Sequence, residues 1–175
     1  MESKLITISK KVCLLGDFAV GKTSLVRRFV YNRFDDQYLS TIGVKVSRKT
    51  VVVPRENDII ELTMMLWDLA GSQEFDNVRA SYLRGAAGAV LVCDLGRGKT
   101  IDGLPVYVEE LYKINPSAHI TIAANKVDLI APPQLEIAQI EQMATRLNLP
   151  FFLTSAKLDA GVEDLFRQLG KLLAG

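Results

Sequence analysis

Short apolar runs rich in β-branched residues alternate along the chain with longer segments in which apolar residues recur at helical spacing. The short runs predict strands, and segments such as the one containing Leu25, Val26, Phe29 and Val30 predict helices. Strands that alternate with helices are joined by right-handed crossovers into a mostly parallel sheet. We therefore expect an α/β fold, doubly wound around six strands with about five helices. The strands are predicted at residues 12–15, 44–53, 59–67, 89–93, 120–124 and 151–153.

The connection between the second and third predicted strands is too short for a helical crossover. Residues 54–58 read Pro-Arg-Glu-Asn-Asp, a polar turn that favours an antiparallel hairpin. The sheet should therefore carry one antiparallel edge strand. In open sheets of this kind ligands bind at the carboxyl ends of the strands, so the candidate chemistry is expected there.

Composition narrows the class of protein. A length of 175 residues suits one domain, and we expect residues 1–175 to share a single fold. Hydrophobic residues at 49% and charged residues at 23% exclude disordered and coiled-coil classes. The 21 Lys and Arg residues nearly balance the 20 Asp and Glu residues, and the net charge of +1 gives no electrostatic reason to expect nucleic acid as a partner.

The cysteines and the apolar runs indicate the cellular compartment in which the protein is expected. Cys13 and Cys93 both lie in apolar runs and are predicted to be buried, reduced thiols, which suits a cytoplasmic protein. No apolar stretch approaches the roughly 20 residues that a membrane-spanning helix needs, and the first residues do not form a secretory signal.

The clearest motif is a phosphate-binding loop. Residues 16–23 read Gly-Asp-Phe-Ala-Val-Gly-Lys-Thr, directly after a predicted strand and at the start of a predicted helix. The glycines allow backbone N–H groups to converge on phosphate oxygens, and the helix N-terminus adds the positive end of its dipole. Lys22 would place its charge on the outer phosphates, and the Thr23 hydroxyl is a candidate Mg²⁺ ligand.

A second motif indicates which base the nucleotide carries. Residues 125–128 read Asn-Lys-Val-Asp after the fifth strand, and the Asp128 carboxylate could accept from both the N1–H and the amino group of guanine. Alone, the motif is ordinary turn chemistry, but behind a phosphate loop it favours guanine. Residues 154–157 read Thr-Ser-Ala-Lys after the last strand, where the Ala156 N–H could donate to guanine O6.

A third group of residues suits a metal and the γ-phosphate. Asp68 ends a predicted strand and Gly71 follows it, so a carboxylate and a backbone N–H would lie beside the phosphates. Thr41, in the loop after the first helix, could bring a second hydroxyl to the metal. Each of these residues is also common in ordinary loops, and the assignment rests on their combination.

Together these motifs resemble a Ras-superfamily small GTPase over nearly the whole chain. Residues 41–43 (Thr-Ile-Gly) and 67–68 (Trp-Asp) resemble the Rab branch most. The resemblance implies a P-loop G domain in which Lys22, Thr41 and Gly71 act on the γ-phosphate, and Thr23, Thr41 and Asp68 hold Mg²⁺. The nucleotide-binding residues it implies are Gly16, Asp17, Phe18, Ala19, Val20, Gly21, Lys22, Thr23, Ser24, Phe34, Tyr38, Thr41, Gly71, Asn125, Lys126, Asp128, Ser155, Ala156 and Lys157.

The same resemblance implies a function and a set of partners. A small GTPase is a switch that binds GTP or GDP, hydrolyses GTP slowly with Mg²⁺, and meets effector, activating and exchange proteins through two switch loops. A second hypothesis is a nucleotide-binding interaction or dimerisation module with negligible turnover, such as a Roc-type domain.

Three departures from the family pattern are visible. Ser72 stands where the family usually has the water-orienting glutamine, and Gln73 comes one residue later. Phe18 stands where the phosphate loop usually has a small residue. Both changes predict slow hydrolysis. The chain also ends without a cysteine for prenylation, so we expect no membrane anchor in it, either because a tail was trimmed or because the protein works unanchored.

Overall fold

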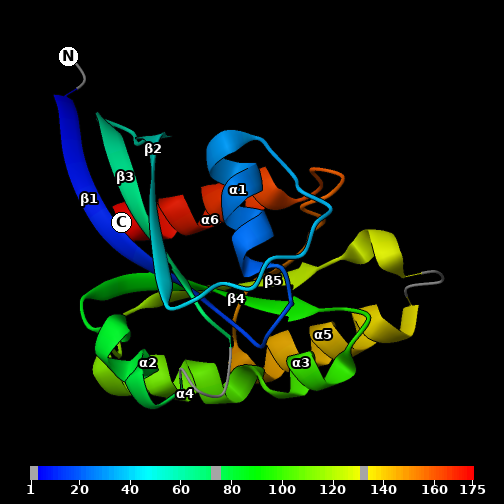
Figure 1. Ribbon diagram of the computed structural model, residues 1–175. Coiled ribbons are helices and arrows are strands. Elements are labelled where there is room, and N and C mark those ends of the chain that lie inside the picture. Colours follow the sequence, from blue (N-terminus) through cyan, green and yellow to red (C-terminus); the bar gives the residue numbers. More distant parts are fainter. Residues whose placement is uncertain (1–3, 72–75, 131–133) are drawn as a thin grey trace.

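A six-stranded sheet organises the computed structural model, which describes residues 4–71, 76–130 and 134–175 (Figure 1). The order across the sheet is β2-β3-β1-β4-β5-β6. The pairing of β2 with β3 is antiparallel and the other pairings are parallel, which confirms the predicted mixed sheet with an antiparallel edge strand. The strands are β1 (Lys4–Leu15), β2 (Val44–Pro54), β3 (Asp58–Leu69), β4 (Ala86–Asp94), β5 (His119–Asn125) and β6 (Phe151–Leu153).

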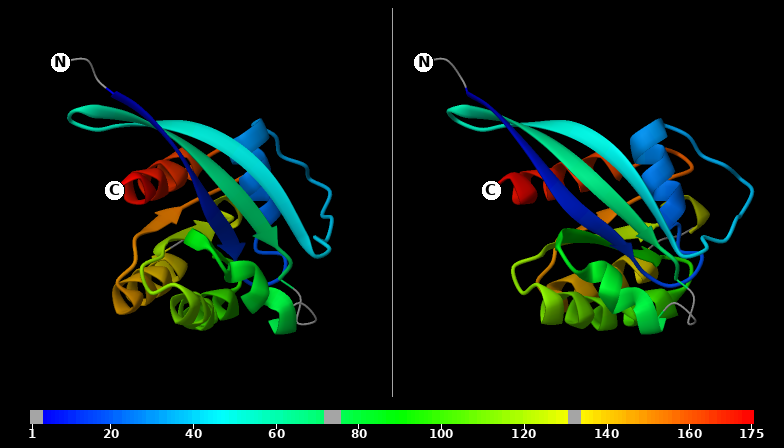
Figure 2. Two further views of the ribbon diagram at one scale, coloured as in Figure 1. Left: turned by 90° about the vertical axis from the view of Figure 1, so that its left-hand side faces the viewer. Right: turned by 60° about the vertical axis from the view of Figure 1, so that its left-hand side comes forward.

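Helices cover both faces of this sheet. Helices α1 and α6 lie on one face and α2 to α5 on the other, as a doubly wound fold requires (Figures 1 and 2). Within the described residues, α3 is a single short turn of helix and the remaining α-helices are longer, in line with the expected number. The helices are α1 (Lys22–Tyr31), α2 (Asp76–Leu83), α3 (Gly98–Asp102), α4 (Leu104–Ile114), α5 (Gln134–Leu147) and α6 (Val162–Ala174), with a 3₁₀ turn η2 (Val127–Leu129). In the part of the chain described, no helix has the length and apolar character needed to cross a membrane.

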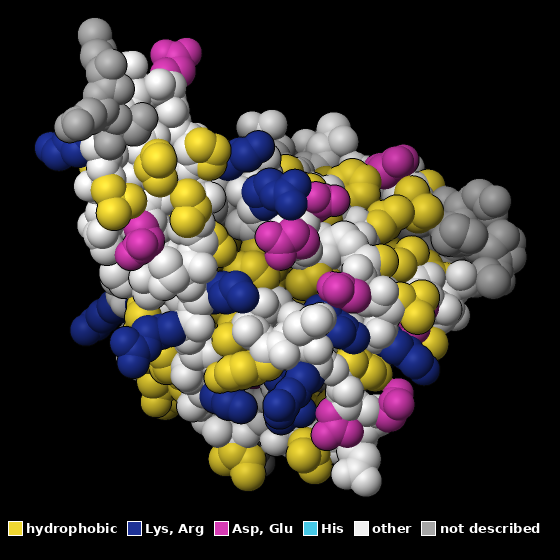
Figure 3. Space-filling model, turned by 90° about the horizontal axis from the view of Figure 1, so that it is seen from above, with side chains coloured by type: hydrophobic (Ala, Val, Ile, Leu, Met, Phe, Trp, Pro, Cys, Tyr) yellow, Lys and Arg dark blue, Asp and Glu magenta, His cyan; other side chains and the backbone are white. Residues whose placement is uncertain are grey.

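The sheet separates two hydrophobic cores because successive side chains of a strand point to opposite faces. On β1, Val12 and Leu14 face α1 and α6, while Cys13 and Leu15 face α2 to α5. Cys13 and Cys93 are buried and free, as expected, and burial raises the pKa of each thiol to about 12. On the face that is uppermost in Figure 1, basic and acidic side chains are interspersed (Figure 3), in keeping with the near-neutral charge.

The first strand is longer than the sequence predicts. It begins at Lys4 rather than at Val12, because residues 4–11 pair with β3 from Asp58 onward and project with it beyond the helices (Figure 2). In this segment only Ile6 and Ile8 pack against a core. The segment alternates apolar and polar residues and contains no continuous apolar run of the kind from which the strands were predicted.

Candidate functional site

A cavity of about 300 Å³ opens at the carboxyl edge of the sheet, where the sequence placed the ligand. Most of the predicted nucleotide-binding residues line it: Phe18, Ala19, Gly21, Lys22, Thr23, Ser24, Phe34, Tyr38, Thr41, Gly71, Asn125, Lys126, Asp128, Ala156 and Lys157. Other predicted residues do not line the cavity, namely Gly16, Asp17, Val20, Asp68 and Ser155. The cavity is also lined by residues that the motifs did not indicate: Arg27, Asp35, Asp36, Gln37, Leu39 and Leu129.

The phosphate loop is shaped by two glycines that no other residue could replace. Gly16 and Gly21 have positive φ angles of 148° and 105°. A Cβ atom at Gly16 would lie 2.2 Å from the carbonyl oxygen of Val92, and one at Gly21 would lie 2.2 Å from Nδ2 of Asn125. Both residues therefore let the loop pass close to the ends of β4 and β5.

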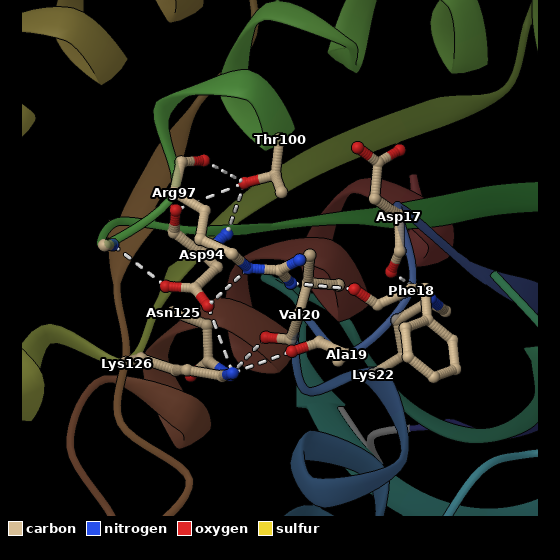
Figure 4. A network of polar contacts seen from close by, with 11 residues as sticks. Asp17, Phe18, Ala19, Val20, Lys22, Asp94, Arg97, Thr100, Asn125 and Lys126 are labelled. Atoms are coloured by element: carbon tan, nitrogen blue, oxygen red, sulfur yellow. Dashed lines mark hydrogen bonds and ion pairs between the residues drawn. The ribbon is translucent and has the colours of Figure 1, made fainter.

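Side-chain donors hold the carbonyl groups of this loop (Figure 4). Lys22 Nζ donates to the Gly16 and Asp17 carbonyls, each at 2.8 Å. Arg97 Nη2 donates to the Phe18 carbonyl at 2.7 Å and Lys126 Nζ to the Ala19 carbonyl at 2.7 Å.

A fourth side chain also bonds the loop, because Asn125 Nδ2 donates to the Val20 carbonyl at 3.0 Å. These bonds fix the shape of the glycine-containing loop at the N-terminus of α1. This is the arrangement that binds anions such as phosphate.

An acidic residue that the motifs did not indicate holds two of these donors. The Asp94 carboxylate, only 6% exposed, lies 3.1 Å from Lys126 Nζ and 3.1 Å from Arg97 Nε. It also accepts from the Gly96 N–H at 2.9 Å. Asp94 ends β4 directly beside Asn125 at the end of β5, and this strand register is the signal that could have found it.

The predicted base-reading residues form a second bonded unit. Ser155 Oγ donates to Asp128 Oδ1 at 2.6 Å, which fixes the carboxylate at the cavity wall. Thr154 Oγ1 donates to Asn125 Oδ1 at 3.1 Å. Arg28 Nε donates to the Ala156 carbonyl at 2.8 Å, which ties this segment to α1.

The three predicted metal ligands meet at one point. Thr23 Oγ1 donates to Asp68 Oδ2 at 2.5 Å and lies 2.7 Å from Thr41 Oγ1. Asp68 is 1% exposed, and its other oxygen, Oδ1, has no hydrogen-bond partner in the described residues. Burial raises the pKa of Asp68, although the bond from Thr23 and the charge of Lys22 act against this. A cluster of hydroxyl and carboxylate oxygens with one unpaired atom suits a hard divalent cation such as Mg²⁺.

Lys22 and Gly71 lie together at the inner end of the cavity. Lys22 is 7% exposed, and burial lowers its pKa to about 8, with the carboxylates of Asp68 and Asp17 opposing the shift. A Cβ atom at Gly71 would lie 2.7 Å from Lys22 Nζ and from the Phe18 nitrogen, so only glycine allows this approach. Ser72 and Gln73, the residues expected to bear on the attacking water, lie outside the described residues.

Two aromatic rings meet at the mouth of the cavity. The rings of Phe18 and Tyr38 are arranged edge to face, with centroids 5.5 Å apart and an interplanar angle of 78°. Both side chains are exposed and line the cavity. The Phe18 side chain therefore extends from the phosphate loop toward the loop that carries Tyr38 and Thr41.

Comparison with known proteins gives consistent matches. A sequence model of the Ras family matches residues 11–174. The GTP-binding protein ypt5 of Schizosaccharomyces pombe is 37% identical over 171 residues, covering 97% of this chain and 80% of that protein. Ras-related protein Rab-13 of Rattus norvegicus is 32% identical over 163 residues, covering 92% of this chain and 78% of that protein. Ras-related protein Rab-5A of Dictyostelium discoideum is 37% identical over 164 residues, covering 93% and 80%.

The lowered pKa of Lys22 makes stability depend on pH. The pKa is about 8 in the folded protein and 10.5 in the unfolded chain, so between these values the unfolded chain binds more protons. Folding without ligand should therefore become more favourable as the pH rises through this window. We expect the free energy of unfolding of the ligand-free protein, relative to Lys22→Met, to increase from pH 8 to pH 10 in denaturant titrations. Lys171→Met, at an exposed lysine, serves as control, and a pH-independent difference for Lys22→Met would contradict the account.

Proposed function

The chain belongs to the Ras family of small GTPases, where it is Rab-like, and on this basis we propose how its residues bind and hydrolyse GTP. It is a GTP-binding switch and a GTPase, and its relatives do not favour an interaction module without turnover. One observation supports the assignment of residues: the phosphate loop, Asp128, Thr23 and Thr41 line one cavity, and Thr23 is hydrogen-bonded to the buried Asp68. We further propose that residues 1–175 form a single G domain.

The phosphates bind in the loop at residues 16–24. Its backbone N–H groups and the N-terminus of α1 hold the oxygens, and the Lys22 ammonium contacts the β- and γ-phosphates. Asn125, Lys126 and Arg97 hold the carbonyls of this loop and so fix its shape. Ser24 contributes to the same end of the site.

The base binds between the ends of β5 and β6. The Asp128 carboxylate accepts from the guanine N1–H and amino group, and Ser155 holds this carboxylate in place. The Ala156 N–H donates to guanine O6, and Phe34 packs against the base. At the outer side of the base site, Lys157 Nζ forms an ion pair of 3.7 Å with Asp36 Oδ1.

Thr23, Thr41 and Asp68 would hold Mg²⁺. The unpaired, buried oxygen of Asp68 and the two hydroxyl groups fit this role, because Mg²⁺ prefers oxygen ligands and keeps several waters and substrate phosphates. When bound, the ion neutralises charge that develops on the β- and γ-phosphate oxygens.

The switch depends on residues that meet the γ-phosphate. Thr41 and the Gly71 N–H contact it, so both loops are held in the GTP state and released after hydrolysis. In that reaction water attacks the γ-phosphorus and the bond to the β,γ-bridging oxygen breaks, giving GDP and phosphate. Effector, activating and exchange proteins would read the two loops. We place the protein in the cytoplasm, which the two buried free cysteines support.

Guanine selection should rest on Asp128. We expect Asp128→Asn to weaken GTP and GDP binding and to shift preference toward xanthine nucleotides, because an amide can donate to the xanthine carbonyl that replaces the amino group. Competition titrations with GTP, XTP and ATP measure this. Asp164→Asn, at an exposed carboxylate on α6, is the matched control. Equal affinity of the natural protein for ATP and GTP would contradict the role of residues 125–128.

Hydrolysis should be slow. Ser72 is too short to replace a glutamine, and Phe18 stands in the path that an activating arginine would take toward the γ-phosphate. We expect turnover at or below the order of 10⁻⁴ s⁻¹ known for Ras without its activator, and little stimulation by an arginine finger. Single-turnover phosphate release should rise modestly in Ser72→Gln and more than additively in free energy when Phe18→Gly is combined with it. A natural rate on the order of 10⁻² s⁻¹ would show that another residue positions the water.

A further inference from the structure

The phosphate loop carries a negative charge that its motif does not require. The pattern fixes Gly16, Gly21, Lys22 and Thr23 and leaves the second position free, yet this chain has Asp17 there. A carboxylate beside a triphosphate is repelled by it, so its position matters for binding.

The Asp17 carboxylate is turned away from the cavity. Phe18 and Ala19 line the cavity and Asp17 does not, and Figure 4 shows its side chain directed away from the contacts of Ala19 and Lys126. The carboxylate lies instead near the start of α4, where a Cβ atom at Gly103 would be 3.6 Å and 3.7 Å from its two oxygens. A helix N-terminus is a favourable place for a negative charge.

One side chain of α4 holds the carboxylate there. The Tyr107 hydroxyl donates to Asp17 Oδ1 at 2.6 Å, a short bond of the kind that charged acceptors form. Tyr107 is only 7% exposed, so its ring has little freedom to turn.

The Tyr107 ring is in turn fixed by an ion pair that crosses to helix α2. Arg79 of α2, 5% exposed, lies with its guanidinium carbon 4.8 Å from the centre of the Tyr107 ring. Its Nε and Nη2 donate to Glu110 Oε2 and Oε1 at 2.8 Å and 2.7 Å. Glu110 lies one turn after Tyr107 on α4, so the pair holds α2 and α4 together around the ring.

We propose that Tyr107 is a positioning residue of the nucleotide site, whose hydroxyl holds the Asp17 carboxylate away from the phosphates. The Arg79–Glu110 ion pair keeps the ring in place and thereby links the phosphate loop to α2. The inference rests on the nucleotide site proposed above.

Release of the carboxylate should disfavour GTP more than GDP, since GTP carries more negative charge beside the loop. Tyr107→Phe removes the hydroxyl and keeps the ring against Arg79. A hydrogen bond to a charged group is strong enough for its loss to change affinity roughly 10-fold. We therefore expect Tyr107→Phe to speed release of a non-hydrolysable GTP analogue about 10-fold and release of GDP less.

The test is a double-mutant cycle of Tyr107→Phe and Asp17→Ala, with fluorescent GDP and a β,γ-imido GTP analogue as probes. If the hydroxyl acts through the carboxylate, the effect of Tyr107→Phe should disappear in the Asp17→Ala background. Tyr112→Phe, at a second tyrosine of α4, is the control for the loss of a hydroxyl. An effect of Tyr107→Phe that persists undiminished without Asp17, or no effect at all, would overturn the proposal.

Two further measurements test the proposal if Tyr107→Phe does not fold or if no nucleotide binds. Should Tyr107→Phe fail to fold, Asp17→Ala alone is informative, because removing the negative charge should shift the ratio of affinities toward GTP by about 2-fold or more. A shift toward GDP would overturn the inference. If the natural protein bound neither probe, the proposed nucleotide site itself would fail, which is a different outcome from an unchanged Tyr107→Phe variant.

Discussion

A buried carboxylate needs a positively charged partner, and the buried carboxylate of Asp68, near the end of β3, is such a group in this protein. The strand order places Asp68 between Leu14 of β1 and Lys45 of β2. Thr23, at the start of α1, donates to Asp68, and Thr41, in the loop that enters β2, is hydrogen-bonded to Thr23. One oxygen of the carboxylate is bonded within this cluster and the other is unpaired in the part of the chain described, so the group suits the divalent cation that we propose to bind here. Sheet order thus joins two distant loops into one sensor.

The same edge of the sheet explains why the base and the phosphates are read by one connected unit. Asn125 ends β5 and Lys126 follows it, at the proposed base site, yet their side chains bind the carbonyls of Val20 and Ala19 in the phosphate loop. Asp94, one strand away, holds Lys126 by an ion pair. Because Asn125 and Lys126 bond the phosphate loop, we expect a change at the proposed base site to alter the phosphate loop as well.

The site residues that belong to local motifs could be predicted from the sequence, whereas those that depend on contacts between distant segments could not. The glycines, Lys22 and Asp128 stand in short patterns whose chemistry can be read directly. Arg97 reaches Phe18 across 79 residues and Tyr107 reaches Asp17 across 90, and no local pattern marks either pair. The fold class followed from the alternation of strands and helices, whereas the start of β1 at Lys4 depends on pairing with β3.

We propose that Thr41 senses the γ-phosphate through the oxygen cluster at Asp68. Calorimetric titration of GDP and of a non-hydrolysable GTP analogue into the natural protein and Thr41→Ala, at fixed Mg²⁺, tests this most directly. The variant should bind GDP almost as the natural protein does and the GTP analogue at least 10-fold more weakly, roughly the loss of one hydrogen bond to a charged group. An equal loss for both nucleotides would show that Thr41 supports the site as a whole and does not sense the γ-phosphate.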